Sequence, residues 1–253
     1  MSRAGRLVVL LVLTAVVAGC GGSKKTTTTA TTPQLKKTAI RVYLLLQGKV
    51  QPVRREVTTT AAATTTAVGN AAFAALVRGP SQAEADLGFK TAVPSAAVWA
   101  IGRVAGGALS LDTDTLPAPA LAQAVYTLTE FPSSRVVFVN DKRYTRADFE
   151  DETPAILVES PLPFQKVKSP VRATGTANTF EATFQYDLVD PDGKVVKTHF
   201  VTATSGTGTR GTFDFTVPFT VGRDGLGKLV VYELSAADGS RIHVVEIPIR
   251  LMR

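Results

Sequence analysis

The strongest constraint on the fold is a strict alternation of apolar and polar side chains in the C-terminal part of the chain. The apolar residues Phe180, Ala182, Phe184, Tyr186 and Leu188 are separated by polar residues at 179, 181, 183, 185 and 187. Because successive side chains of a strand point to opposite faces, this pattern predicts a strand with one buried face. Such a strand needs neighbouring strands and a second apolar layer, so the C-terminal part is expected to be built from sheets.

The same pattern returns further along the chain. Phe213–Phe219, Leu229–Leu234 and Ile242–Leu251 read as strands, and turn signals stand at Asp190–Gly193 and Ala237–Ser240. Proline presets φ for a turn and glycine accepts positive φ, so these signals have a mechanism. Short strands separated by turns, with no helix expected, predict an antiparallel β-sandwich.

The N-terminal part mixes strand and helix periodicity. Predicted strands cover Ile40–Leu46, Val53–Val57, Val98–Val104, Ala108–Leu111 and Arg135–Val139, and predicted helices cover Ala71–Arg78 and Pro119–Thr129. The first helix is expected to begin at Gly69-Asn70 and to end at Gly79-Pro80, and Thr58–Thr66 is expected to be strand or loop. Helices and strands that alternate in this way predict a layered α/β domain.

Four stretches of this part resemble a known family. They are Leu76-Val77-Arg78-Gly79-Pro80, Ala92-Val93-Pro94, Gly107–Asp112 and Val125–Phe131. The residue types in these stretches, and the order of the stretches along the chain, are similar to those of the GerMN domain of sporulation and spore-germination proteins. The resemblance implies an α+β or α/β layered domain over residues 39–148.

The C-terminal part carries a second resemblance. Its matching stretches are Ser169-Pro170-Val171, Gly175-Thr176-Ala177, Phe180-Glu181-Ala182, Gly211-Thr212-Phe213 and Tyr232–Ser240. They are similar to the immunoglobulin-like domain that accompanies bacterial spore-germination domains. The resemblance implies an all-β immunoglobulin-like sandwich over residues 158–253, and residues 149–157 are expected to form a connector.

The first twenty residues predict where the protein resides. Basic Met1–Arg6 and apolar Leu7–Val17 have the layout of a secretory signal, and the apolar run of eleven residues is shorter than the ~20 that a spanning helix needs. Val17-Ala18-Gly19-Cys20 then resembles the lipobox of bacterial lipoproteins, and a thiolate is the nucleophile that acylation requires. The resemblance implies removal of residues 1–19 and a lipid anchor at Cys20 on the extracytoplasmic face of the membrane. The alternative is an ordinary secretory cleavage site with Cys20 as a plain apolar residue.

The net charge of +7 does not predict a nucleic-acid-binding protein. Six basic residues and no acidic residue lie in the first 39 positions, so the rest of the chain is almost neutral. Residues 20–38 are rich in Thr and Lys, which predicts a solvated linker close to anionic headgroups.

Residues with catalytic potential are few. The only two histidines, His199 and His243, lie in separate predicted strands, and His243 shares the parity of the apolar Val245. Both are therefore expected to be ordinary strand residues, with a ligand or base as the alternative. Asp112 and Asp114 lack the following glycine and distal Glu of a calcium loop, so they are expected to be a solvated pair. No metal or cofactor is expected.

Three further features of the sequence are expected to have structural rather than catalytic or ligand-binding roles. The acidic group at Asp148, Glu150, Asp151 and Glu152 is expected to be solvated connector. Arg210 with the glycines at 206, 208 and 211 lacks the strand-to-helix context of a phosphate loop. Trp99 and Tyr43 lie in predicted strands and are expected to be buried rather than part of a binding patch.

These observations favour a non-catalytic, membrane-anchored binding or scaffolding module of the cell envelope. Its expected partner is an envelope protein or peptidoglycan, and the resemblance adds sporulation or germination as the setting. The alternatives are an enzyme that acts on wall polymer and a solute-binding lipoprotein. The sequence names no binding residues beyond the lipobox, and it leaves the oligomeric state open.

Overall fold

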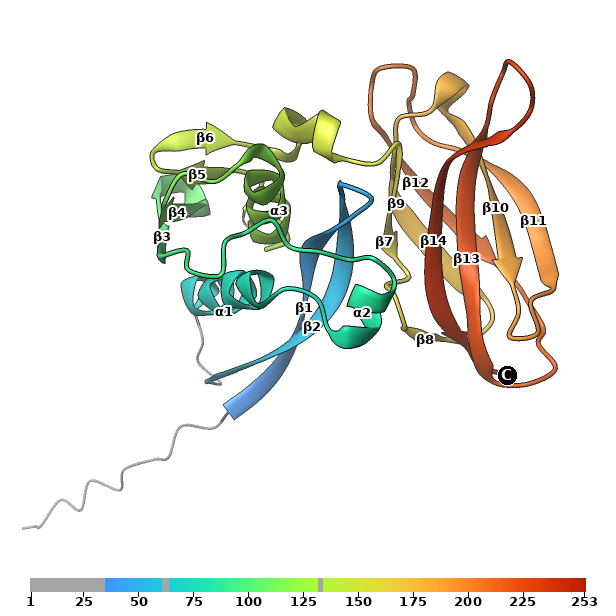
Figure 1. The fold of residues 1–253 in the computed structure, drawn as a ribbon, viewed down its shortest axis with the longest axis horizontal. Helices are drawn as coiled ribbons and strands as arrows, with labels where there is room; N and C mark the ends of the chain where they lie inside the picture. Colours follow the sequence, from blue (N-terminus) through green and yellow to red (C-terminus); the bar gives the residue numbers. More distant parts are fainter. Residues whose placement is uncertain (1–34, 61–63, 132–133) are drawn as a thin grey trace, which may run out of the picture. The chain divides into compact units, whose positions relative to one another are not determined.

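A computed structural model describes residues 35–60, 64–131 and 134–253 (Figure 1). Residues 34–253 form one compact unit. The described chain is mostly β-strand, with its α-helices in the N-terminal part and strands throughout the C-terminal part, as the sequence predicts. In the described ranges, no helix is long and apolar enough to cross a membrane.

The N-terminal part folds around two small sheets and two longer helices. Its elements are β1 (Leu35–Leu46), β2 (Lys49–Thr60), α1 (Thr65–Arg78), α2 (Gln82–Asp86), β3 (Trp99–Arg103), η1 (Ala105–Gly107), β4 (Leu109–Thr113), α3 (Ala118–Leu128), β5 (Val137–Val139), β6 (Lys142–Tyr144) and the 3-10 turn η2 (Arg146–Glu152).

β1 and β2, each 12 residues long, form an antiparallel hairpin. Gln47 and Gly48 join the strands with φ angles of 53° and 79°, the paired positive values of a tight turn that matches strand twist. The second strand is longer than the predicted Val53–Val57, because Thr58–Thr60 continue the pairing with the start of β1. The expectation of strand or loop for Thr58–Thr66 is therefore correct at Thr58–Thr60, whereas Thr65 and Thr66 belong to α1.

Helix α1 begins earlier than the sequence predicts. Thr64, not the expected Asn70, is the N-cap, and its hydroxyl accepts a hydrogen bond from the backbone N–H of Ala67 at 3.2 Å. Gly69 instead lies inside the helix, where an added Cβ would approach the Ile101 side chain to 3.4 Å. The end at Gly79, with φ of 79°, is as predicted.

A four-stranded sheet in the order β3-β4-β5-β6 completes this part. β3 and β4 pair antiparallel across a turn with positive φ at Gly106 and Gly107, and α3 connects β4 to the parallel β5. The hairpin to β6 was not expected, and its turn uses positive φ at both Asn140 and Asp141. Side chains from β1, β2, α1, α3 and this sheet share one apolar core.

The C-terminal part contains strands and one short 3-10 turn. Its elements are β7 (Ile156–Ser160), β8 (Lys166–Val167), β9 (Val171–Ala177), η3 (Phe180–Ala182), β10 (Thr183–Val189), β11 (Val195–Thr202), β12 (Gly211–Val217), β13 (Gly225–Leu234) and β14 (Arg241–Leu251). They form a five-stranded sheet in the order β11-β10-β13-β14-β8 and a three-stranded sheet in the order β12-β9-β7.

Inner side chains of both sheets enclose one core, the arrangement expected of a sandwich. Phe184 on one sheet meets Phe213 on the other edge-on, with ring centroids 4.9 Å apart. Phe180 departs from the predicted alternation and is 58% exposed. The reason is local, since Glu181 and Ala182 adopt positive φ in η3 and the strand starts only at Thr183.

Candidate binding site

The structure places the predicted site residues apart from one another. Cys20 and the lipobox residues Val17, Ala18 and Gly19 lie outside the described residues. Asp112 is exposed, and Asp114 accepts a long hydrogen bond of 3.4 Å from the Val98 N–H. In the described part of the chain, no group of three or more His, Cys, Asp or Glu side chains is placed to hold a metal ion.

The two histidines lie on different strands of one sheet. β10 and β13 separate His199 on β11 from His243 on β14, a distance of about 14 Å at the usual strand spacing. His199 Nδ1 accepts a hydrogen bond from the Phe200 N–H at 2.9 Å, and His243 Nδ1 lies 2.9 Å from Glu233 Oε2. They therefore do not form a common site.

His243 does not share the burial of Val245 that its parity predicted. The register between β13 and β14 shifts after Val231, so the pairing resumes at Glu233 with Ile242. This shift is a β-bulge in which His243 has φ of 53°, and its side chain is exposed. Because a bulge interrupts the two-residue alternation of the strand, the alternation does not predict the burial of His243 correctly.

The acidic group before β7 is structured rather than simply solvated. Asp148 accepts hydrogen bonds from Thr145 at the start of η2, and these bonds lower its pKa. Glu150 pairs with Arg210 at 2.8 Å and accepts a 2.8 Å hydrogen bond from Asn178, and Arg210 is the main cause of its lowered pKa. This segment of the expected connector is therefore held by contacts to the sandwich.

The glycines near Arg210 serve close chain packing. An added Cβ at Gly206 would lie 2.4 Å from the Thr179 carbonyl oxygen, and one at Gly211 would lie 2.3 Å from the Ser205 nitrogen. Both positions therefore require glycine. The guanidinium of Arg210 itself pairs with Glu150, a contact that the sequence did not predict.

A cluster of partly buried charges lies where the two parts of the chain meet. This junction cluster consists of Arg41, Tyr43, Glu130, Arg146 and Glu159, from β1, the end of α3, η2 and β7. Arg146 donates to both carboxylates, at 2.7 Å to Glu159, and the Tyr43 hydroxyl lies 2.8 Å from an oxygen of each. Arg41 donates to Glu130 from the other side.

The environment of the junction cluster raises the pKa of two of its groups, Tyr43 and Arg146. Burial raises the pKa of Tyr43 well above its usual value, so the phenol stays neutral and can donate. Burial alone would lower the pKa of Arg146, but the neighbouring Tyr43, Glu130 and Glu159 raise it. Arg146 also lies 4.8 Å from the Tyr126 ring centroid, a cation–π contact.

The sequence predicted that the side chains of Tyr43 and Trp99 are buried. Tyr43 is fully buried, as predicted, whereas Trp99 is only half-buried.

We predict that Arg146→Met lowers the free energy of unfolding by about 3 kcal/mol, because it leaves two partly buried carboxylates close together without their shared cation. The value is at the lower end for a buried pair, since 29% of the Arg146 side chain is exposed. Urea unfolding of residues 34–253 measures the change.

The matched control is Arg223→Met, which breaks the exposed pair with Asp192 and should cost no more than about 1 kcal/mol. Equal losses for the two variants would show that the junction cluster has no special role. Adding Glu159→Gln to Arg146→Met should recover part of the loss, because Glu159 is paired with Arg146 whereas Glu130 keeps its pair with Arg41.

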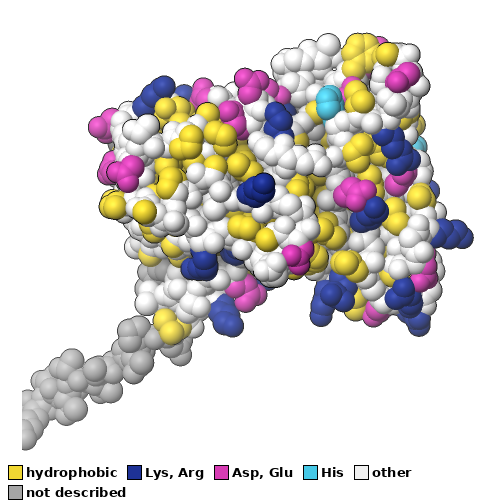
Figure 2. All heavy atoms as spheres, in the orientation of Figure 1, with side chains coloured by type: hydrophobic (Ala, Val, Ile, Leu, Met, Phe, Trp, Pro, Cys, Tyr) yellow, Lys and Arg dark blue, Asp and Glu magenta, His cyan; other side chains and the backbone are white. Residues whose placement is uncertain are grey.

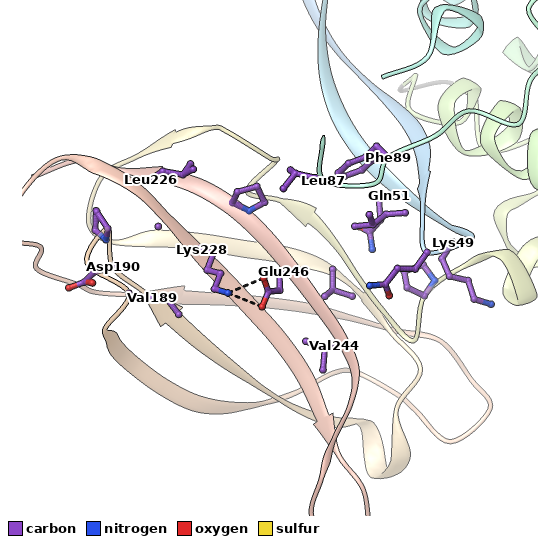
Figure 3. Close-up of a pocket in the computed structure, with 18 residues that line it drawn as sticks. Lys49, Gln51, Leu87, Phe89, Val189, Asp190, Leu226, Lys228, Val244 and Glu246 are labelled. Atoms are coloured by element: carbon purple, nitrogen blue, oxygen red, sulfur yellow. Dashed lines mark hydrogen bonds and ion pairs between the residues drawn. The ribbon is translucent and has the colours of Figure 1, made fainter. Parts of the chain in front are cut away.

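A groove of about 670 Å³ lies beside the outer face of the five-stranded sheet (Figure 3). Leu87 and Phe89, which follow α2, form its wall, and Leu226, Val244 and Val189 contribute apolar floor from the sheet. Lys49, Asp190, Lys228 and Glu246 are its charged residues, two of each sign. The groove is therefore largely apolar and carries no net charge.

Ion pairs hold both sides of the groove. On the sheet, Lys228 donates to the two oxygens of Glu246 at 2.8 and 2.9 Å. Behind the wall, Arg55 on β2 makes a bidentate pair with Glu84 on α2, with both N–O distances 2.7 Å. The wall segment is also tied to β1 by reciprocal backbone hydrogen bonds of 2.8 Å between Leu45 and Lys90.

The wall depends on the ionised form of Glu84. Burial raises the pKa of this carboxyl, but the hydrogen bonds from Arg55 and Ser81 outweigh burial and lower it below its usual value. A lowered pKa in the folded state adds stability above the unfolded pKa of about 4.3, and that stability is lost as the pH falls through the folded value.

We predict that Glu84→Gln removes about 1.5–3 kcal/mol at pH 7 and flattens the decline of stability below about pH 4.3. Thermal or urea unfolding between pH 7 and pH 2 measures both effects. Asp86→Asn, at an exposed position of the same helix, is the control and should change the stability at pH 7 by no more than about 0.5 kcal/mol. An unchanged acid profile for Glu84→Gln would contradict this assignment.

The charges elsewhere on the visible face are mixed. Figure 2 shows acidic and basic side chains interspersed, without a large area of one sign. This distribution gives no electrostatic footprint for a nucleic acid on that face.

The fold is that of a two-domain protein, an α/β-containing domain followed by an immunoglobulin-like domain. Residues 41–145 match the family described as "Sporulation and spore germination", and residues 155–240 match "Immunoglobulin-like domain of bacterial spore germination". The chain thus belongs with proteins that carry a GerMN-type domain followed by this immunoglobulin-like domain.

A solved structure, the tandem GerMN domains of the sporulation protein GerM from Bacillus subtilis, is similar to part of the chain. The identity is 21%, and the match covers 41% of this chain and 38% of that one, with a TM-score of 0.33. No curated protein matches the chain.

Proposed function

We propose that the protein is a lipid-anchored, non-catalytic binding module on the extracytoplasmic face of the cell membrane, working in sporulation or germination. The observation that carries the proposal is the succession of two spore-germination domain families behind a sequence, Val17–Cys20, that resembles a lipobox. The first domain would act as the layered GerMN-like unit and the second as a sandwich that presents its outer face.

The groove supports a role in binding. Its volume falls within the range of ligand and peptide sites, and its lining is apolar with a few polar groups. The ionisable groups Lys228 and Glu246 on its floor are paired with each other, which suits a surface that contacts a partner better than one that moves protons. The proposed partner is an envelope protein or peptidoglycan.

The anchor is tested by Cys20→Ser. We expect wild-type protein to incorporate a fatty-acid probe in cells and to sediment with membranes, because two or more acyl chains give stable attachment. The variant should stay unlabelled, and either leave the membrane or keep its signal peptide. Ser23→Ala, which leaves the lipobox intact, is the control. Equal labelling of wild type and Cys20→Ser would refute the anchor.

The non-catalytic part is tested on purified peptidoglycan. Residues 34–253 should release no soluble fragments, measured by chromatography of the supernatant. Release of soluble fragments by the wild-type protein would contradict this expectation. If replacing His199, His243, Asp112 and Asp114 by Asn or Gln then stopped the release without changing thermal unfolding, the protein would be a wall-acting enzyme.

A further inference from the structure

Strand β14 has a free backbone edge beside the groove. Its partner on one side is β13, except at the bulge of His243 and Val244, but β8 on the other side pairs only with Arg250 and Leu251. Toward that second side, the Arg250 N–H donates to the Gln165 carbonyl at 2.8 Å, and the Pro248 carbonyl accepts from the Phe164 N–H at 2.6 Å. Backbone groups of the even-numbered residues therefore point away from β13.

The same two-residue period assigns the backbone groups further up the strand. The C=O of Val244 and both the N–H and C=O of Glu246 point to this edge, where no described strand pairs with them. Both residues also line the groove (Figure 3). Unpaired donors and acceptors at a sheet edge form a template for another extended chain.

We propose that the groove binds an extended, uncharged segment of a partner polypeptide, which adds as a strand along Val244–Glu246 of β14. This inference rests on the proposed binding function and specifies the chemistry of the partner. The main chain of the segment would pair with the free edge, and its alternate side chains would pack against Leu87, Phe89 and Leu226.

Three observations favour this occupant. The edge already accepts a strand, since β8 pairs with its next residues. Its donors and acceptors repeat every second residue, about 6.8 Å, which is the repeat of an extended peptide and not of a sugar chain. The four charged residues of the groove cancel, so a charged segment would gain nothing from them.

Glu246→Pro isolates the backbone contribution. Proline removes the N–H that faces the groove, and the pairing with β13 does not use that group. Pro248 already occupies an equivalent position two residues on, so the strand tolerates proline with this orientation. Glu246→Ala removes the side chain and its pair with Lys228 but keeps the N–H, which makes it the matched control.

The probe is a phage-displayed library of uncharged heptapeptides, selected on residues 34–253. Binders are synthesised with a fluorophore, and their Kd values are measured by anisotropy. We expect Glu246→Pro to weaken binding at least about tenfold and Glu246→Ala less than about threefold, with thermal unfolding confirming that both fold. Leu226→Ser should weaken binding, whereas Val98→Ser, at a residue 73% exposed and outside the groove, should not.

A second arm needs no variant. Peptides that are N-methylated on the amides facing β14 should lose binding to the wild-type protein, while methylation of the alternate amides should be tolerated. Loss in both registers, or in neither, overturns strand addition and would do so even if Glu246→Pro failed to fold.

Other results also overturn the proposal. These are a library that yields no binder, binders that Glu246→Pro retains, and soluble peptidoglycan fragments that displace every peptide and bind more tightly than it. The proposal is also overturned if a peptide of residues 21–34 binds in the groove and protein comprising residues 21–253 binds no peptide of the library. Loss of labelling at Cys20 is read separately, so the anchor and the groove can fail independently.

Discussion

The guanidinium of Arg146 is the interaction on which the rest of the arrangement depends. It lies between Glu130 at the end of α3 and Glu159 on β7, and it covers the rings of Tyr43 and Tyr126. One side chain thus joins the first strand of the first domain to the first strand of the second. A planar guanidinium with five N–H donors can bind both carboxylates and cover the two rings at once, whereas the ammonium of a lysine is a single point charge.

The position of the groove follows from this junction and from the wall behind α2. The pair between Arg55 and Glu84 places the segment with Leu87 and Phe89, and the contacts of Arg210 with Glu150 hold η2 against the sandwich. Each contact joins residues far apart in the chain. The groove is therefore a property of the assembled unit and of neither domain by itself.

The sequence predicted the local features and missed those that need distant partners. Two-residue alternation located the strands of the sandwich, and the predicted turns contain Gly193 and Gly239 at positive φ. The first helix ends at Gly79, as predicted. Alternation failed at Phe180 and His243, where a turn and a bulge interrupt the period. The junction cluster gave no signal in advance, because its charged residues are scattered along β1, α3, η2 and β7 and each resembles an ordinary surface charge.

Strand β7 shows how closely the two cores are joined. Ile156 and Val158 are buried in the core of the sandwich, and Leu157 between them is buried in the core of the first domain. A single extended segment therefore supplies successive side chains to two different interiors. An insertion or deletion of one residue here would exchange the two sets, so during evolution this pair of domains can diverge in its loops but cannot be spaced apart at this strand.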